Sequence, residues 1–316
     1  MDSLFVLNAA HLHLLLNHVP TLGAVGGLSL LVLAFIRRHD GLQQAGLEVL
    51  FVVALLTLPV YVTGVAAYKK LPMGPEVTDV AIRAHQDAAL SGFTVAELAG
   101  FIAWFALWQA RRRGRPSPAL VGAATVLSIL ALAIMARAAT LGGEIHHSEI
   151  RAAGAVTAAM NPQAFVAAQI SHFMVYSRWA WPLAETVHFL GLSLSFGVLL
   201  AVNLRILGVM RQVPFAELHA WLPWGMLGFG ANLITGMVFF VGQPGQYVES
   251  APFHWKIVFL MLAGANFLYL TVFKKAWATD GLEAPFADKA MAVGSMLSWL
   301  AVLYAGRMLP FIGDAF

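Results

Sequence analysis

The stretch that decides the fold is LEVLFVVALLTLPVYVTGVAA, residues 47–67, in which Glu48 is the one charged side chain. At about 20 residues it is long enough to cross the hydrocarbon core of a bilayer as an α-helix. A bilayer core offers no water to bond backbone amides, so the run is predicted as a helix and not a strand. Seven further apolar runs predict seven more membrane helices, at about 19–36, 88–109, 118–140, 181–204, 221–241, 255–273 and 291–309.

The composition of the whole chain agrees with a membrane protein. Hydrophobic residues make up 59% of the 316 residues, charged residues make up 11%, and the mean hydropathy is +0.75. About a quarter of the residues of a soluble domain are charged. The formal net charge of +3 comes from residues in short loops between apolar runs, which is a topology signal, so no nucleic-acid partner is expected. The absence of cysteine excludes disulfides, thiolate-bound iron–sulfur clusters and covalently attached c-type haem.

The positions of the basic residues predict the orientation of the chain. Five lysines and arginines lie on the side of the membrane that holds both termini, and eleven lie on the other side: Arg37, Arg38, Arg111, Arg112, Arg113, Arg115, Arg205, Arg211, Lys274, Lys275 and Lys289. Short cytoplasmic loops carry the excess of Lys and Arg. We therefore expect a multi-pass protein of the bacterial inner (plasma) membrane, with both termini on the periplasmic side.

An internal repeat is visible as residue spacing. The first half has a histidine at the start of its first run, a histidine before its third run and an arginine near the end of its fourth, and the second half repeats this order: His18, His85, Arg137; His188, His254, Arg307. The gaps between the histidines are 67 and 66 residues, and each gap from first histidine to arginine is 119. The pairs Thr63-Gly64 and Thr235-Gly236 also correspond. An all-α protein is expected, with two parallel four-helix bundles related by a pseudo-twofold axis along the membrane normal. The predicted divisions are 1–145, an outer-surface linker with amphipathic helices at 146–178, and 179–316.

The repeated histidines predict haem binding. One imidazole from each of two helices is a common way for a helical bundle to hold a haem. We expect two b-type haems, one between His18 and His85 and one between His188 and His254. Arg137 and Arg307 are suited to bind the haem propionates. Two alternatives need no haem. The histidines could be hydrated at the membrane interface, and the arginines could extend their side chains to the lipid head groups.

A second histidine cluster is predicted on the same side of the membrane. His11 and His13 precede the first membrane run, and His146 and His147 follow the fourth, within the sequence GGEIHHSE. Imidazoles and carboxylates together bind copper or zinc. This cluster could hold such a metal, could supply one of the haem ligands in place of a histidine assigned above, or could be a solvated loop.

Two short motifs resemble known families. The segment His13 to Pro20, HLLLNHVP, resembles the HPxxVHFP signature of a bacterial four-helix membrane domain family of unknown function, with Leu14 where the signature has proline. The second half contains ETVHFLG at residues 185–191, which is similar to an ExxHxxG start in another uncharacterised four-helix family and is reminiscent of membrane b-type cytochromes and copper-resistance membrane proteins. The resemblance implies a helical membrane fold and haem or copper binding.

These observations predict a membrane-embedded b-type dihaem cytochrome subunit. It would carry electrons between the quinone pool or a partner subunit and periplasmic carriers such as cytochrome c, within a respiratory or photosynthetic complex. An electron-transfer subunit is expected rather than a stand-alone enzyme. Quinone is a further candidate ligand, and membrane lipids are expected partners. Two other functions remain open: a copper-handling or transport protein, and a haem-free structural subunit of a membrane complex.

Overall fold

The computed structural model describes residues 8–69, 79–146, 165–273 and 283–309, and within them all regular structure is helical. In these described parts, eight helical segments are long and apolar enough to cross a membrane, which confirms the eight predicted spans. The chain divides into two compact units, which we call unit 1 (Met1–Ser171) and unit 2 (His172–Phe316). Each unit supplies four of the spans.

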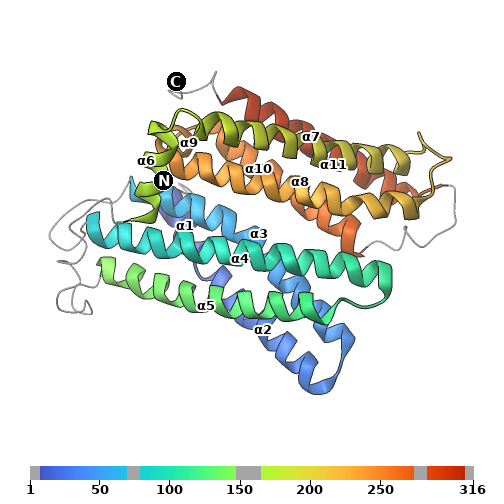
Figure 1. The fold of residues 1–316 in the computed structure, drawn as a ribbon, viewed down its shortest axis with the longest axis horizontal. Helices are drawn as coiled ribbons and strands as arrows, with labels where there is room; N and C mark the ends of the chain where they lie inside the picture. Colours follow the sequence, from blue (N-terminus) through green and yellow to red (C-terminus); the bar gives the residue numbers. More distant parts are fainter. Residues whose placement is uncertain (1–7, 70–78, 147–164, 274–282, 310–316) are drawn as a thin grey trace, which may run out of the picture. The chain divides into compact units, whose positions relative to one another are not determined.

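Unit 1 contains five helices before the segment that leads to unit 2: α1 (Ala9–Leu16), α2 (Val19–Arg37), α3 (Asp40–Tyr68), α4 (Asp79–Arg113) and α5 (Pro118–His146). Helix α2 packs on α3 and α5, α4 packs on α3 and α5, and α1 packs on α3 (Figure 1). Small residues allow close approach at these contacts. A Cβ atom added to Gly46 of α3 would lie only 3.1 Å from the carbonyl oxygen of Gly27 in α2.

Unit 2 contains α7 (Ala180–Ile206), α8 (Phe215–Gly242), the short α9 (Pro244–Val248), α10 (Ala251–Leu268) and α11 (Phe286–Met308). Helix α7 packs on α8 and α11, and α10 packs on α11 (Figure 1). The closest approach of backbones is again at glycines, because a Cβ on Gly228 of α8 would lie 2.6 Å from the Gly191 carbonyl oxygen. The α10 helix continues into a π-helical turn, Tyr269–Phe273.

Helix α6 (Val166–Tyr176) crosses the boundary between the two units in the sequence and lies in the predicted linker at 146–178. In unit 1, the carboxylate of Asp87 in α4 accepts hydrogen bonds from the backbone N–H groups of Val166 (2.6 Å) and Ala167 (3.0 Å). These N–H groups have no partner inside a helix, so Asp87 acts as their cap from a distant part of the chain.

Several helix boundaries differ from those expected from hydropathy, and two of the differences affect the histidines. The N-terminal span is broken by a turn at Asn17 and His18, so that α1 is a separate helix with its own direction for its side chains. Helix α4 begins at Asp79, nine residues before the apolar run at 88–109, so His85 lies inside a helix and not before it. The first turns of this helix contain several polar residues, so hydropathy alone does not detect where it begins.

Candidate functional site

His13 is held against α3 by a hydrogen bond and by a glycine. Its Nδ1 atom lies 3.1 Å from the carbonyl oxygen of Val60. A carbonyl oxygen only accepts, so Nδ1–H is the donor and the Nε2 atom keeps a lone pair. One turn further along α3, a Cβ atom on Gly64 would lie 2.8 Å from Cε1 of the ring. Gly64 thus leaves the space that the imidazole fills.

His85 of α4 has the same arrangement against α5. Its Nδ1 atom donates to the carbonyl oxygen of Ala138 at 2.8 Å, which again leaves Nε2 with a lone pair. A Cβ atom on Gly142, one turn after Ala138, would lie 3.1 Å from Cε1 of the ring. His13 and His85 therefore each pack on a glycine and donate to the carbonyl four residues before that glycine.

His13 and His85 are near enough to interact electrostatically. Metal-binding histidines nearly always donate the other ring N–H to a carbonyl or carboxylate, because this fixes the tautomer and makes the ligating nitrogen more basic. Both rings meet this condition through a backbone carbonyl. We call His13 and His85 the unit 1 histidine pair, and its donor chemistry suits a haem iron or a copper ion.

The other residues predicted for unit 1 lie in different surroundings. His18 is exposed at the start of α2, and its side chain caps no backbone group. His11 and Arg137 are also exposed. His146 is the last residue of α5, and His147 lies outside the described residues. Among the residues that the structure describes, no group of three or more His, Asp or Glu side chains could hold a metal ion, so a metal there would depend on the pair.

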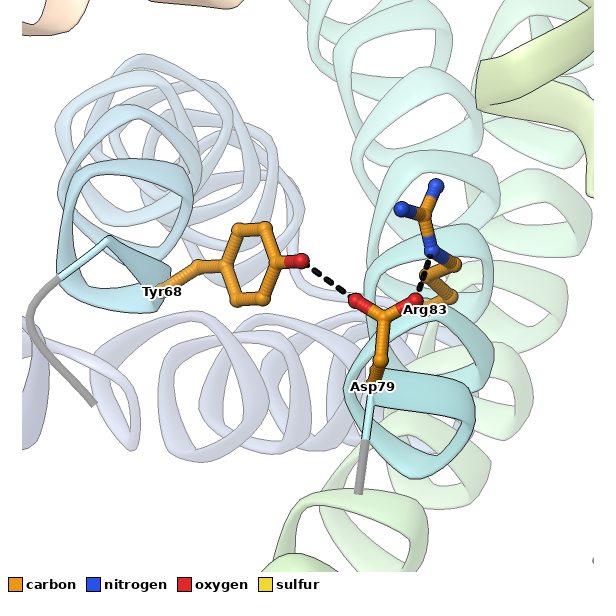
Figure 2. Close-up of polar contacts among 3 residues, drawn as sticks. All are labelled: Tyr68, Asp79 and Arg83. Atoms are coloured by element: carbon orange, nitrogen blue, oxygen red, sulfur yellow. Dashed lines mark hydrogen bonds and ion pairs between the residues drawn. The ribbon is translucent and has the colours of Figure 1, made fainter. Parts of the chain in front are cut away.

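Three polar side chains, which we call the clamp, join the end of α3 to the start of α4: Tyr68, Asp79 and Arg83 (Figure 2). The hydroxyl of Tyr68, at the end of α3, donates to Asp79 at the start of α4. The other carboxylate oxygen of Asp79 accepts from Nε of Arg83 at 2.5 Å. Tyr68 lies one turn after Gly64, and Arg83 lies two residues before His85. The clamp therefore fixes the two helices whose registers position the histidine pair.

Glu97 of α4 is a carboxyl group within a membrane-spanning helix of unit 1. Its Oε1 atom lies 2.9 Å from the Thr57 hydroxyl, which itself donates to the Ala54 carbonyl at 2.6 Å. A hydroxyl has one proton, and the shorter contact to Ala54 takes it. The bond between Thr57 and Glu97 then needs a proton from Glu97, so the geometry favours the neutral carboxylic acid.

In unit 2, His188 of α7 is held against α8 by a side-chain hydroxyl. The Thr235 hydroxyl donates to the Ala231 carbonyl at 2.7 Å, so it accepts from Nδ1–H of His188 at 2.8 Å. As in unit 1, this leaves Nε2 with a lone pair. The ring also lies over a glycine, because a Cβ on Gly236 would be 3.8 Å from its Cε1 atom.

The side chain that interacts with His188 from α10 is Lys256. Its Nζ atom lies 3.6 Å from the place where a Cβ on Gly306 of α11 would be. His254, by contrast, is exposed, and its Nε2 atom bonds to the Val248 carbonyl at 2.9 Å. Arg307 is exposed as well. Lys256 was not among the predicted site residues, although its charge within the apolar run at 255–273 was a visible signal.

One further titratable group of unit 2 lies near Glu185. Tyr247 belongs to α9, which connects two of the spans of unit 2. Burial, together with the nearby Glu185 carboxylate, raises the pKa of Tyr247 to about 12. Its phenol is therefore protonated at neutral pH and can act as a hydrogen-bond donor.

A scan against protein-family models and searches of curated proteins and of solved structures found no match for this chain.

Proposed function

We propose that this membrane protein is an electron carrier that holds a b-type haem between His13 and His85. The observation that carries the proposal is the geometry of the unit 1 histidine pair. Two imidazoles from different helices interact, each has its Nδ1–H anchored on a carbonyl, and each keeps a lone pair on Nε2. Two such imidazoles are the axial ligands that b-type haems use.

The residues present fit this group in donor chemistry. Gly64 and Gly142 make room for the two imidazoles, since a Cβ at either position would lie within 3.1 Å of a histidine ring atom. Neither ring can rotate freely, because each carbonyl bond fixes the plane of its imidazole. When bound, the haem supplies one-electron redox chemistry, and the chain supplies the ligands, their orientation and an apolar surround.

The wider role follows from the expected topology. Two parallel four-helix bundles in a bacterial inner membrane would hold the pair towards the periplasmic side. The protein would then pass electrons between the quinone pool or a partner subunit and a periplasmic carrier such as cytochrome c. The proposal covers one haem, in unit 1, because His254 of unit 2 is exposed and its Nε2 atom is bonded to Val248.

A copper ion at the same pair is the second candidate function. It is favoured by the close packing of both rings against glycines, which suits a small ion. Unit 1 also has an apolar groove of about 530 Å³, which neither histidine lines. The residues that line it are Val25, Leu28, Ser29, Val32, Leu33, Ile36 and Leu132. Copper held by two imidazoles would indicate a copper-handling protein.

The visible spectrum of the purified protein, together with its metal content, separates these functions. A Soret band with sharp α-bands after reduction, and about one iron per chain, is the result expected for the b-type haem. A colourless protein that carries stoichiometric copper would support the second candidate. A protein that is colourless and free of metal after expression with added haem precursor would refute both and leave a structural subunit.

A further inference from the structure

Lys256 places a cationic group inside a membrane-spanning segment of unit 2. It lies five residues after Ala251, where that segment begins, which corresponds to about 8 Å along the helix axis. Charged groups at such depths are costly unless they are paired, and they commonly mark binding sites or ion pathways. The surroundings of this ammonium therefore need an explanation.

The side chain of Lys256 lies along a gap in α11. A Cβ atom on Gly306 would lie 3.6 Å from the Nζ atom of Lys256, 3.7 Å from its Cε atom and 4.0 Å from its Cδ atom. A residue with a longer side chain at position 306 would occupy the path that the lysine follows. Gly306 and Lys256 in unit 2 thus resemble Gly142 and His85 in unit 1, where a glycine of the last helix also faces a side chain from the helix before it.

Among the residues that the structure describes, no carboxylate pairs with this ammonium. The group that it does interact with is His188, which presents a neutral acceptor, because Nδ1–H is bonded to Thr235. A cation and a hydrogen-bond acceptor therefore lie within range of electrostatic interaction, and an anion that also has a hydroxyl group would suit both.

Two exposed aromatic side chains indicate the membrane level of this pair. Trp255 directly precedes Lys256, and Tyr304 lies two residues before Gly306. Their exposed fractions are 60% and 68%. Tryptophan and tyrosine concentrate at the depth of the lipid head groups. Lipid phosphates lie at that level, which argues for a lipid as the source of the anion.

We propose that Lys256 and His188 form a binding site for a phosphate-bearing ligand, namely the head group of an anionic lipid. The Lys256 ammonium binds a phosphate oxygen, and Nε2 of His188 accepts a hydrogen bond from a hydroxyl of the same head group. Phosphatidylglycerol has both features, whereas phosphatidylcholine has a compensating positive charge and no hydroxyl. This site does not depend on haem binding in unit 1.

The test measures binding to the delipidated full-length protein by native mass spectrometry and by the shift of its thermal midpoint. The probes are phosphatidylglycerol, phosphatidylcholine and inorganic phosphate. Phosphatidylglycerol should bind and raise the midpoint, and the other two should not. Binding of inorganic phosphate alone would assign the site to a free anion and overturn the lipid proposal, and equal binding of both lipids would also overturn it.

Variants then locate the site. Lys256→Gln should weaken phosphatidylglycerol binding on the order of tenfold or more, and Lys256→Arg should retain it. Lys289→Gln, which changes a lysine at the other end of α11, is the matched control and should bind as the wild type does. If Lys256→Gln does not fold, Gly306→Leu displaces the lysine but keeps its charge, and it should lose binding. Unchanged binding in both of these variants would refute the site.

Discussion

Replacing Gly64 with alanine should move the imidazole of His13. The added Cβ would lie 2.8 Å from Cε1 and 3.1 Å from Nδ1 of the ring. The ring must retreat by about 0.7 Å to restore an ordinary carbon–carbon contact. A shift of that size lengthens the bond from Nδ1 to the Val60 carbonyl, which is now 3.1 Å, beyond hydrogen-bonding distance.

The expected change in the free energy of unfolding combines one stabilising contribution with two destabilising ones. Alanine in place of glycine inside a helix gains about 1 kcal/mol from backbone propensity. Loss of the His13 bond costs about 1 kcal/mol, and the overlap with the ring adds a further 1–2 kcal/mol. Gly64→Ala should therefore destabilise unit 1 by about 1–2 kcal/mol. Gly26→Ala is the matched control, because a Cβ at Gly26 meets nothing within 4 Å and only the favourable term remains.

The assay compares thermal midpoints in one detergent and the haem content per chain. Gly64→Ala should lower both, and Gly26→Ala should leave the midpoint unchanged or raised. Gly142→Ala, at 3.1 Å from His85, should have a smaller effect, and Gly236→Ala, at 3.8 Å from His188, should be tolerated. Equal midpoints for Gly64→Ala and Gly26→Ala would show that His13 does not occupy this position.

Three further variants test other contacts of unit 1. Glu97 should show the infrared carbonyl band of a protonated carboxylic acid, and Glu97→Gln should abolish it; a wild-type spectrum without that band would contradict the neutral state. Tyr68→Phe removes the donor to Asp79. Because the clamp is partly exposed, the stability should fall by only about 0.5–1 kcal/mol and the thermal midpoint only slightly. A large fall would mean that the clamp does more than join two helix ends. Asp87→Ala removes the cap of α6, so the amides in its first turn should exchange with deuterium faster, at a cost of about 1 kcal/mol, and unchanged exchange would argue against the cap.

Hydropathy was sufficient for the eight spans, because burial in lipid demands long apolar runs whatever their packing. It was not sufficient for the ends of the helices. The turn at Asn17 and His18 separates α1 from α2, and the polar residues from Asp79 onward extend α4 beyond its apolar run. Both features depend on local hydrogen bonds and tertiary contacts, which leave no mark in a hydropathy pattern.

The spacing of the histidines predicted a site near one end of the helices but did not identify its partners. Equal gaps made His18 the expected partner of His85, whereas in the structure His13 is the histidine within range of electrostatic interaction with that residue. Which histidine of the segment faces α3 depends on the direction in which α1 projects its side chains, and that direction is set by its packing on Gly64. The histidine spacing did not indicate Lys256, because a repeat need not conserve the type of side chain in both halves.

The most direct test of the proposed function is the haem content of three single variants, expressed and purified alike. His13→Gln and His85→Gln remove the two proposed ligands, and His18→Gln replaces an exposed histidine five residues from the first. Loss of the bis-imidazole haem spectrum in the first two variants, with a normal spectrum in the third, is the expected result. A full haem complement in His13→Gln, or loss of haem only in His18→Gln, would contradict the assignment.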